Sequence, residues 1–396
     1  MRIAIISPFN PKEIADLLDS SDTVKPTESI ATSVNNIVRG FVALGHDVTV
    51  ITSSSGSNER ILEYKGENLR VYVIQNRYKL GLFGLRTYQK IHRLIREHIN
   101  EFDVLHAHWT SEYAFSLIPF VSQIPCFCSV RDWAPYLMRI RRTFKSKIRM
   151  RIRYYFFKKV MKTKGITKVA NSLYISRRMS NYLHHNDVPL IPNSVNSRLI
   201  VDSCKIKNEG PVFISVGQSL NDKRKNYSTL LKAFVRLRKD YPNAVLKLIG
   251  DGDEKLFKSL SEEHDFFLNI EFLGKLSHSQ VIEQIDKSSV HVHPAFEETF
   301  GNVFLEAAAR NIPSIGGYDA GAVAQVLDYG RAGCLCDISD VESLYMAMKL
   351  LIEDTSYREY ITRNAHKRVS QIYSDTVVCQ EHIKLYKSRI MCNDKF

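Results

Sequence analysis

Two glutamates separated by seven residues, Glu298 and Glu306, lie where a loop runs into a predicted helix. The preceding residues 291–295 (HVHPA) have the pattern of a strand end, so the loop belongs to the carboxyl edge of a sheet, where open α/β sheets bind ligands. Gly301 lets a ligand approach the backbone, and the helix that follows presents unpaired N–H groups to an anion such as phosphate. Glu306 lies about one turn into the helix, and because helical side chains point toward the helix N-terminus, its carboxylate can reach the same ligand. Because a carboxylate repels a diphosphate, we expect Glu306 to accept hydrogen bonds from sugar hydroxyls, which predicts a nucleotide-sugar site.

The segment 297–309 (EETFGNVFLEAAA) resembles the E-x7-E signature of the retaining glycosyltransferases of family 4. Two glutamates at this spacing are otherwise common on the solvated face of a helix. The strand that ends in Pro294, the Phe300-Gly301 pair and the alanine-rich helix before Pro313 favour the signature. The resemblance covers nearly the whole chain and implies an α/β protein of the GT-B fold, with two doubly wound Rossmann-like domains facing a central cleft.

The length of 396 residues suits two domains of about 200 residues each. By resemblance, residues 1–203 form an N-terminal acceptor-binding Rossmann-like domain, and residues 204–372 form a C-terminal domain that binds the nucleotide-sugar donor. Residues 373–396 resemble the helix that crosses back to the N-terminal domain.

Further donor contacts come from the resemblance in the second domain. The strand 211–216, a polar loop and a helix again predict an anion site. The family places an Arg after Gly217 and a Lys at Lys225, both on the donor diphosphate; Gln218 stands at the Arg position, and Arg224 is a candidate for the missing charge. A Lys-Arg-Lys run is otherwise often a solvated turn. The expected donor-binding residues are Gly217, Gln218, Arg224, Lys225, Gly250, Lys275, Leu276, Glu298, Phe300, Gly301, Asn302, Val303 and Glu306.

Two residues of the first domain follow predicted strands that end at the same sheet edge, His108 and Arg131. Family members often carry His near the reacting sugar where Arg131 stands here. Arg131 cannot exchange a proton, so we expect it to stabilise charge or to position the acceptor. The structural alternatives are an ion pair of Arg131 with Asp132 or another nearby carboxylate, and a purely structural role for His108 at the end of its strand. The predicted catalytic residues are Glu298, Lys225, Arg131 and His108.

The basic residues are concentrated in one segment. Residues 133–186 contain 15 Lys and Arg and no Asp or Glu, whereas the rest of the chain has 40 basic and 42 acidic residues. Within it we expect one helix from Tyr136 to Lys164, in which Ile140, Phe144, Ile148, Ile152, Phe156 and Val160 form a single apolar stripe. Such a helix predicts binding to an anionic membrane surface through Arg141, Arg142, Lys145, Lys147, Arg149 and Arg151. The alternative is that the stripe packs on the first domain and the cations face water.

These features predict a metal-independent retaining glycosyltransferase of the EC 2.4 class. It would move a sugar from a UDP- or GDP-sugar to a glycan or lipid-linked acceptor in cell-surface polysaccharide or glycolipid assembly, with no cofactor besides this co-substrate. No metal is expected, because no D-x-D pair lies at a predicted strand edge. The alternatives are a GT-B sugar-nucleotide epimerase and a basic nucleic-acid-binding protein, the second disfavoured because one segment carries the whole basic excess.

The location is expected to be cytoplasmic and peripheral at the inner face of the plasma membrane. No apolar run approaches the roughly 18 to 20 residues that span a bilayer, and the N-terminus lacks a signal-peptide pattern. The seven cysteines include no C-x-x-C pair, so we expect reduced thiols rather than disulfides or a zinc site.

Overall fold

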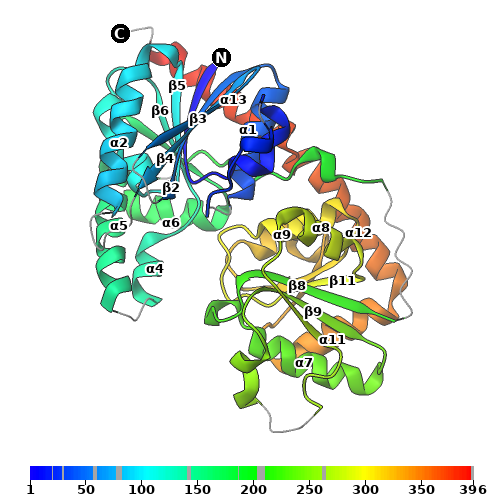
Figure 1. Ribbon diagram of the computed structural model, residues 1–396. Coiled ribbons are helices and arrows are strands. Elements are labelled where there is room, and N and C mark those ends of the chain that lie inside the picture. The colour runs from blue at the N-terminus through cyan, green and yellow to red at the C-terminus, as the bar shows by residue number, and fades with distance from the viewer. Residues whose placement is uncertain are drawn as a thin grey trace. The chain divides into compact units, whose positions relative to one another are not determined.

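The chain folds into two compact α/β units (Figure 1). The computed structural model describes residues 1–19, 21–28, 31–56, 60–76, 83–140, 144–185, 187–202, 210–260 and 265–393. The first unit consists of Met1–Asn196 and Asp375–Phe396, and the second unit of Ser197–Ser374. The division after Asn196 lies earlier than the expected one after residue 203.

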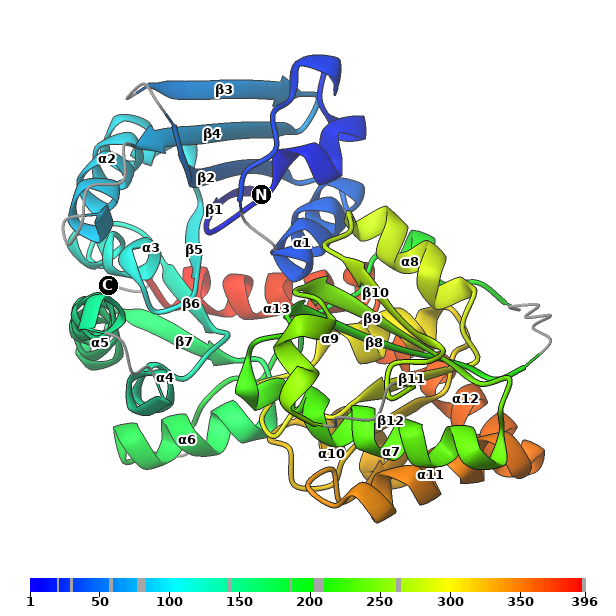
Figure 2. The same ribbon diagram turned by 60° about the horizontal axis from the view of Figure 1, so that its bottom comes forward.

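The first unit has a seven-stranded sheet in the order β3-β4-β2-β1-β5-β6-β7, which Figure 2 shows strand by strand. Only β3 runs antiparallel to its neighbour, β4. Ile3 to Ile6 of β1 are fully buried, as expected for a parallel strand covered on both faces. The strands are β1 (Arg2–Ile6), β2 (Asp47–Ser55), β3 (Ile61–Gly66), β4 (Leu69–Asn76), β5 (Val104–His108), β6 (Cys126–Val130) and β7 (Ile166–Ala170).

Helices cover both faces of this sheet and form two separate apolar cores. One core contains residues of α2, α3, α5 and α6, and the other contains residues of α1 and α13. The helices are α1 (Thr32–Ala43), α2 (Phe83–His98), α3 (Glu112–Phe115), α4 (Ala134–Ile140), α5 (Phe144–Lys162), α6 (Leu173–Leu183) and α13 (Asp375–Asn393).

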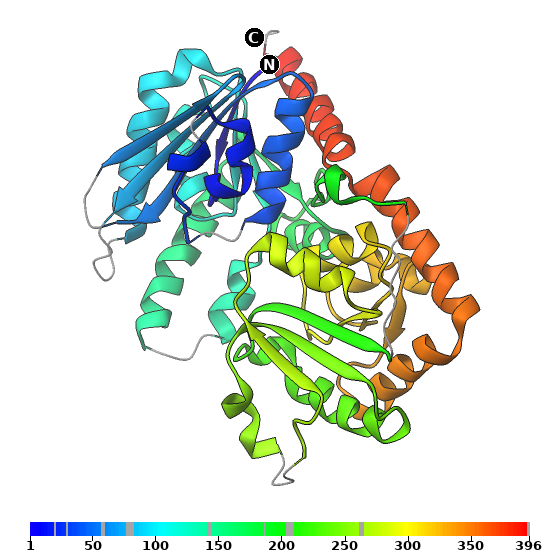
Figure 3. The same ribbon diagram turned by 45° about the vertical axis from the view of Figure 1, so that its right-hand side comes forward.

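The last helix of the chain, α13, packs beside α1 in the first unit (Figure 3). The Cys379 thiol donates to the carbonyl of Ile37 at 3.2 Å. A Cβ at Gly40 would lie 2.7 Å from that sulfur, so a glycine in α1 allows this close approach.

The second unit has a six-stranded, entirely parallel sheet in the order β10-β9-β8-β11-β12-β13. The chain builds outward from β8 on one side and from β11 on the other, so a topological switch point lies between these two strands. The strands are β8 (Val212–Ser219), β9 (Val245–Asp251), β10 (Ile270–Gly274), β11 (Val290–His293), β12 (Ser314–Gly317) and β13 (Cys334–Cys336).

In the second unit α8 and α9 cover one face of the sheet, and α7 and α11 cover the other (Figure 1). The helices are α7 (Tyr227–Asp240), α8 (His278–Asp286), α9 (Asn302–Ala309), α10 (Val323–Val326), α11 (Val341–Glu353) and α12 (Thr355–Arg368). Each unit is therefore a mainly parallel sheet between helical layers, and the prediction of two doubly wound Rossmann-like domains is confirmed.

The prediction of one basic helix with a single apolar stripe is wrong. The segment contains two helices, α4 and α5, and within α5 Phe156 and Val160 are buried whereas Ile148 is 38% exposed. Steps of four residues advance about 400° around a helix, so each apolar residue is displaced by about 40° from the one before. Arg141, Arg142 and the side chain of Lys145 lie outside the described part of the structure, and Lys147, Arg149 and Arg151 are exposed. In the described ranges, no helix has the length and apolarity that a membrane span requires.

Candidate active site

Three loops meet at the carboxyl edge of the second unit's sheet and hold Glu298 between them. The loop after β8 joins the loop after β11, because the Phe296 amide donates to the Arg224 carbonyl at 2.8 Å. The Glu298 amide donates to the Ala320 carbonyl at 3.2 Å, and its carbonyl accepts from the Ala322 amide at 2.9 Å. Glu298 is thereby fixed through its backbone beside the switch point, where open parallel sheets bind ligands.

Glycines allow the close packing of these loops. Gly321 has φ +71°, and a Cβ there would lie 2.3 Å from the Glu298 carbonyl oxygen. Gly301, predicted to admit a ligand, has φ +89° immediately before α9, and a Cβ would meet the Phe304 ring at 2.7 Å. Both positions therefore need glycine for backbone conformation and for contact with a neighbour.

The Glu298 side chain receives two donors on one oxygen. Its Oε1 contacts Lys225 Nζ and lies 2.8 Å from His293 Nε2. Burial alone would raise the pKa of Glu298, but the Lys225 charge and the His293 hydrogen bond hold it well below its ordinary value. Among the described residues no side chain donates to the other oxygen, Oε2. The arrangement keeps a carboxylate ionised in a buried setting and leaves one oxygen for a ligand.

His293 is a site residue that the sequence analysis missed. It is the last residue of β11 and is buried, and burial followed by the nearby Lys225 charge lowers its pKa. A neutral imidazole that donates from Nε2 fits the carboxylate it faces. The available signal was its position near the end of a predicted strand, five residues before Glu298.

The second glutamate, Glu306, lies in α9 and has a histidine partner of its own. His278 Nε2, at the start of α8, lies 3.0 Å from Glu306 Oε1. The residues of α9 from Val303 to Ala309 are all buried. His278 was also missed, because 28 residues separate it from Glu306 and no motif in the sequence connects them.

Arg224 is engaged by carboxylates. Its guanidinium donates to Asp222 at 2.6 to 3.2 Å, and it lies 3.9 Å from Glu297. These contacts do not support the hypothesis that Arg224 supplies the charge missing at Gln218, which is exposed.

The remaining predicted donor residues divide between core and surface. Phe300 is almost fully buried and its ring packs against Tyr373, so its side chain belongs to the core. A Cβ at Gly217 would lie 2.1 Å from the Tyr227 hydroxyl, and one at Gly250 would lie 2.8 Å from the Gly217 carbonyl oxygen. Lys275 pairs with Asp251 at 3.4 Å on the surface. Leu276 and Asn302 are partly buried. Val303 belongs to the apolar core beneath α8 and α9.

In the first unit, Arg131 and His108 form one buried cluster. Arg131 Nε donates to His108 Nδ1 at 2.9 Å, and its Nη1 donates to Ser33 Oγ at 3.0 Å and to Asn193 Oδ1. Burial lowers the pKa of Arg131 to about 9 and lowers that of His108. Asp132 pairs with Arg153.

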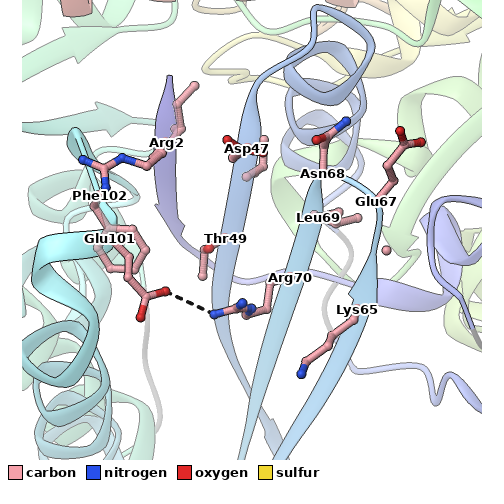
Figure 4. A pocket seen from close by; sticks show the side chains of 13 residues that line it. Arg2, Asp47, Thr49, Lys65, Glu67, Asn68, Leu69, Arg70, Glu101 and Phe102 are labelled. Atoms are coloured by element: carbon pink, nitrogen blue, oxygen red, sulfur yellow. Dashed lines mark hydrogen bonds and ion pairs between the residues drawn. The ribbon is translucent and has the colours of Figure 1, made fainter.

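A pocket of about 360 Å³ lies at the opposite, amino edge of the first sheet (Figure 4). It is lined by the first residues of β1, β2 and β4, and Arg70 pairs there with Glu101 at 3.1 Å. The pocket contains charged groups of both signs and lies away from the carboxyl edge, where open α/β sheets bind ligands. It is therefore distinct from the cluster of Arg131 and His108. Within the described ranges, no group of three or more His, Cys, Asp or Glu side chains could hold a metal ion.

Two family models together match residues 30–368. The model of Glycosyltransferase Family 4 matches residues 30–199, and that of Glycosyl transferases group 1 matches residues 197–368. An alpha-monoglucosyldiacylglycerol synthase from Acholeplasma laidlawii is 25% identical over 318 residues, which cover 73% of this chain and 77% of that protein. A phosphatidyl-myo-inositol mannosyltransferase from Mycolicibacterium smegmatis is 23% identical and covers 98% of this chain and 94% of its own.

Solved structures support the fold. A sucrose-phosphate synthase from Thermosynechococcus elongatus superposes with a TM-score of 0.78 at 16% identity, covering 99% of this chain and 100% of that one. Three observations point to the same family. The chain has two glutamates with the E-x7-E spacing, it folds into two Rossmann-like units, and two adjoining family models match it. The chain belongs to the family 4 glycosyltransferases of the GT-B fold.

Proposed function

We propose that this glycosyltransferase transfers a sugar, with retention of anomeric configuration, from a UDP- or GDP-sugar to a glycan or lipid-linked acceptor. The observation that carries the proposal is Glu298, whose Oε1 is held by Lys225 and His293 while Oε2 is left for a hydroxyl of the donor sugar. Two relatives are named as an alpha-monoglucosyldiacylglycerol synthase and a phosphatidyl-myo-inositol mannosyltransferase, which favours transfer over the epimerase and nucleic-acid alternatives.

Charge stabilisation is the proposed source of catalysis. As the bond to the diphosphate breaks, the leaving group gains negative charge and the sugar ring gains oxocarbenium character. Lys225 and the amides at the start of α9 would meet the first charge, and Glu298 the second. Glu306 would bind hydroxyls of the nucleotide. The proposed chemistry uses no metal and no cofactor besides the co-substrate.

The residues of the first unit have a separate proposed role. Arg131 is buried, permanently charged near neutral pH and fixed by His108, Ser33 and Asn193. We expect it to position an acceptor or to stabilise charge, with His108 holding its guanidinium. Replacement by Lys would remove the planar set of donors and lower turnover.

The donor is identified by a thermal-shift screen of the purified protein against UDP-, GDP- and ADP-sugars. A ligand at 100 times its Kd stabilises a protein by about 2.7 kcal/mol, so the correct donor gives a clear rise in melting temperature. Incubation with that donor and candidate acceptors, followed by NMR of the new anomeric centre, tests retention. Conversion of one nucleotide sugar into another without an acceptor would contradict transfer and support the epimerase.

An anionic membrane at the inner face of the plasma membrane is the proposed location of the acceptor. The outer face of α5, formed by Lys147, Ile148, Arg151, Tyr155, Lys158, Lys159 and Lys162, supports this partner. Ile148 and Tyr155 are 38% and 48% exposed two turns apart, and all five cations around them are exposed. None of the described carboxylates pairs with these cations. Two apolar side chains within a cationic ring are suited to a lipid interface.

Vesicle sedimentation tests this location. Wild type should bind vesicles that contain anionic lipid at low salt and release them at high salt, because each Lys or Arg near the surface contributes about 1 kcal/mol that salt screens. Replacing Lys147, Arg151, Lys158 and Lys159 with Gln should abolish binding. The matched control replaces the exposed Lys232, Lys239, Lys255 and Lys258 of the second unit. Equal losses in both variants would contradict a specific face.

A further inference from the structure

The contact between His278 and Glu306 joins two helices that the sequence places far apart. Glu306 is the charged residue of a buried, alanine-rich helix, and its side chain is only 11% exposed. Its Oε1 faces His278 Nε2 at 3.0 Å. Because a carboxylate only accepts hydrogen bonds, His278 donates. In the described part of the chain, no side chain donates to the second oxygen of Glu306, Oε2.

His278 is held rigidly as the first residue of α8. Ser277 caps the helix, with its Oγ accepting from the Gln280 amide while the Gln280 side chain accepts from the Ser277 amide at 2.9 Å. The buried residues Val281 and Ile285 pack α8 into the same apolar core as Val303 of α9. The imidazole therefore projects from a fixed helix end toward Glu306.

A second ion pair joins the same two helices at their other ends. Arg310, which follows α9, donates to both oxygens of Asp286 at 2.6 and 2.8 Å. This pair keeps α8 and α9 together without involving Glu306. The two contacts can therefore be separated experimentally, one affecting the carboxylate and the other only the packing of the helices.

We propose that His278 is a positioning residue for the donor: it holds Oε1 of Glu306 so that Oε2 is presented to the ribose hydroxyls of the nucleotide. The inference rests on the proposed function, in which Glu306 binds those hydroxyls. A free glutamate side chain must lose rotamer freedom before it can bind, and a fixed donor on one oxygen removes that cost in advance. The contribution of His278 should therefore appear in nucleotide affinity and should depend on ribose hydroxyls.

The proposal is tested by calorimetric titration with UDP and 2′,3′-dideoxy-UDP. If wild type prefers guanine, GDP and 2′,3′-dideoxy-GDP replace them. His278→Ala should weaken UDP binding about tenfold, the loss of one charge-assisted hydrogen bond. His278→Gln should recover most of the affinity, because the Gln amide reaches the position of Nε2. His278→Ala should affect the dideoxy nucleotide much less than UDP. The control, Asp286→Asn, should lower the melting temperature and leave UDP affinity unchanged.

The Glu306→Ala background separates positioning from direct contact. If His278 acts through Glu306, adding His278→Ala to Glu306→Ala should cause no further loss of UDP affinity. A further tenfold loss in that background, or unchanged UDP binding by His278→Ala alone, would overturn the proposal. If His278→Ala weakens both nucleotides equally, the ribose is not the partner and the proposal is also wrong. Wild type that binds no nucleotide at all would instead remove the proposed function, and the inference with it.

Discussion

The pairing of Lys225 with Glu298 gives each residue two roles, one in the fold and one in the proposed chemistry. Both side chains are mostly buried, so each neutralises the charge of the other before any ligand binds. A diphosphate would contact the Lys225 ammonium while Lys225 stays paired with Glu298 Oε1, and a sugar hydroxyl would occupy Oε2. Stability and activity are therefore linked at this pair.

We predict that Lys225→Met lowers both turnover and the melting temperature. Removing one partner of a buried ion pair leaves an uncompensated charge, which costs roughly 3 to 5 kcal/mol when burial is complete and less at this partly exposed site. The double variant Lys225→Met with Glu298→Gln should regain most of the melting temperature and none of the activity. Calorimetric melts and a transfer assay check this. A double variant no more stable than the single one would contradict the pairing.

The sequence predicted the residues that carry a motif and missed their partners. Glu298 and Glu306 were predicted from their spacing and their place where a loop meets a helix, and Lys225 from its match to the family position. His293 and His278 were missed because each is defined only by a contact that folding creates. Arg224 was proposed as a phosphate contact from its charge alone, and nothing in the sequence showed that Asp222 and Glu297 would hold it.

At the scale of elements, the close packing of the loops around Glu298 requires a glycine at position 321. Gly321 lies against the Glu298 carbonyl, whereas Gly330, also at positive φ, has no atom within 4 Å of a Cβ added to it. The two positions share the left-handed conformation and differ only in what surrounds them. Substituting alanine at each position therefore compares a glycine that contacts Glu298 with one that contacts nothing.

Gly321→Ala should reduce turnover and melting temperature, because the new methyl group would displace the Glu298 backbone. Gly330→Ala should cost only the left-handed conformation, about 1 to 2 kcal/mol, and leave turnover unchanged. Steady-state kinetics of both variants checks this. Equal turnover in the two variants would mean that the Glu298 loop tolerates displacement.

Elements with a buried apolar run or a family motif were predicted well, and the basic segment was not. The buried strand β11 and the helix of the E-x7-E segment are present as expected. In α5, regular four-residue spacing was interpreted as a stripe, although the helix repeat of 3.6 residues rotates it from the core to the surface. Tertiary packing selected which of those apolar residues are buried.

At the scale of the molecule, both units bury neutral histidines. Burial is the main cause that lowers the pKa of His106, His108 and His291, and it lowers that of His382 to about 3. His106 Nδ1 contacts the Tyr386 hydroxyl at 2.5 Å and so ties α13 to the first sheet. The unfolded chain binds protons on these histidines near pH 6.5, whereas the folded chain does so only at lower pH.

Stability should therefore fall as the pH drops below about 6.5. Each such histidine contributes stability that is fully present above its unfolded pKa and is lost toward its folded pKa, at up to about 1.4 kcal/mol per pH unit. Melting temperatures at pH 7.5, 6.5 and 5.5 measure this. His382→Phe, which keeps the ring contacts with Phe41 and Tyr386, should flatten the dependence. Identical melting temperatures at pH 7.5 and 5.5 would contradict it.

All the predicted donor residues lie in the second unit, where we assign Glu298 to the sugar and Glu306 to the nucleotide. The most direct test is calorimetric titration of wild type and Glu298→Gln with the bare nucleoside diphosphate and with the nucleotide sugar that the screen identifies. We predict that Glu298→Gln binds the bare nucleotide as wild type does and binds the nucleotide sugar about tenfold more weakly. Equal losses for both ligands, or no loss for either, would contradict the assignment of Glu298 to the donor sugar.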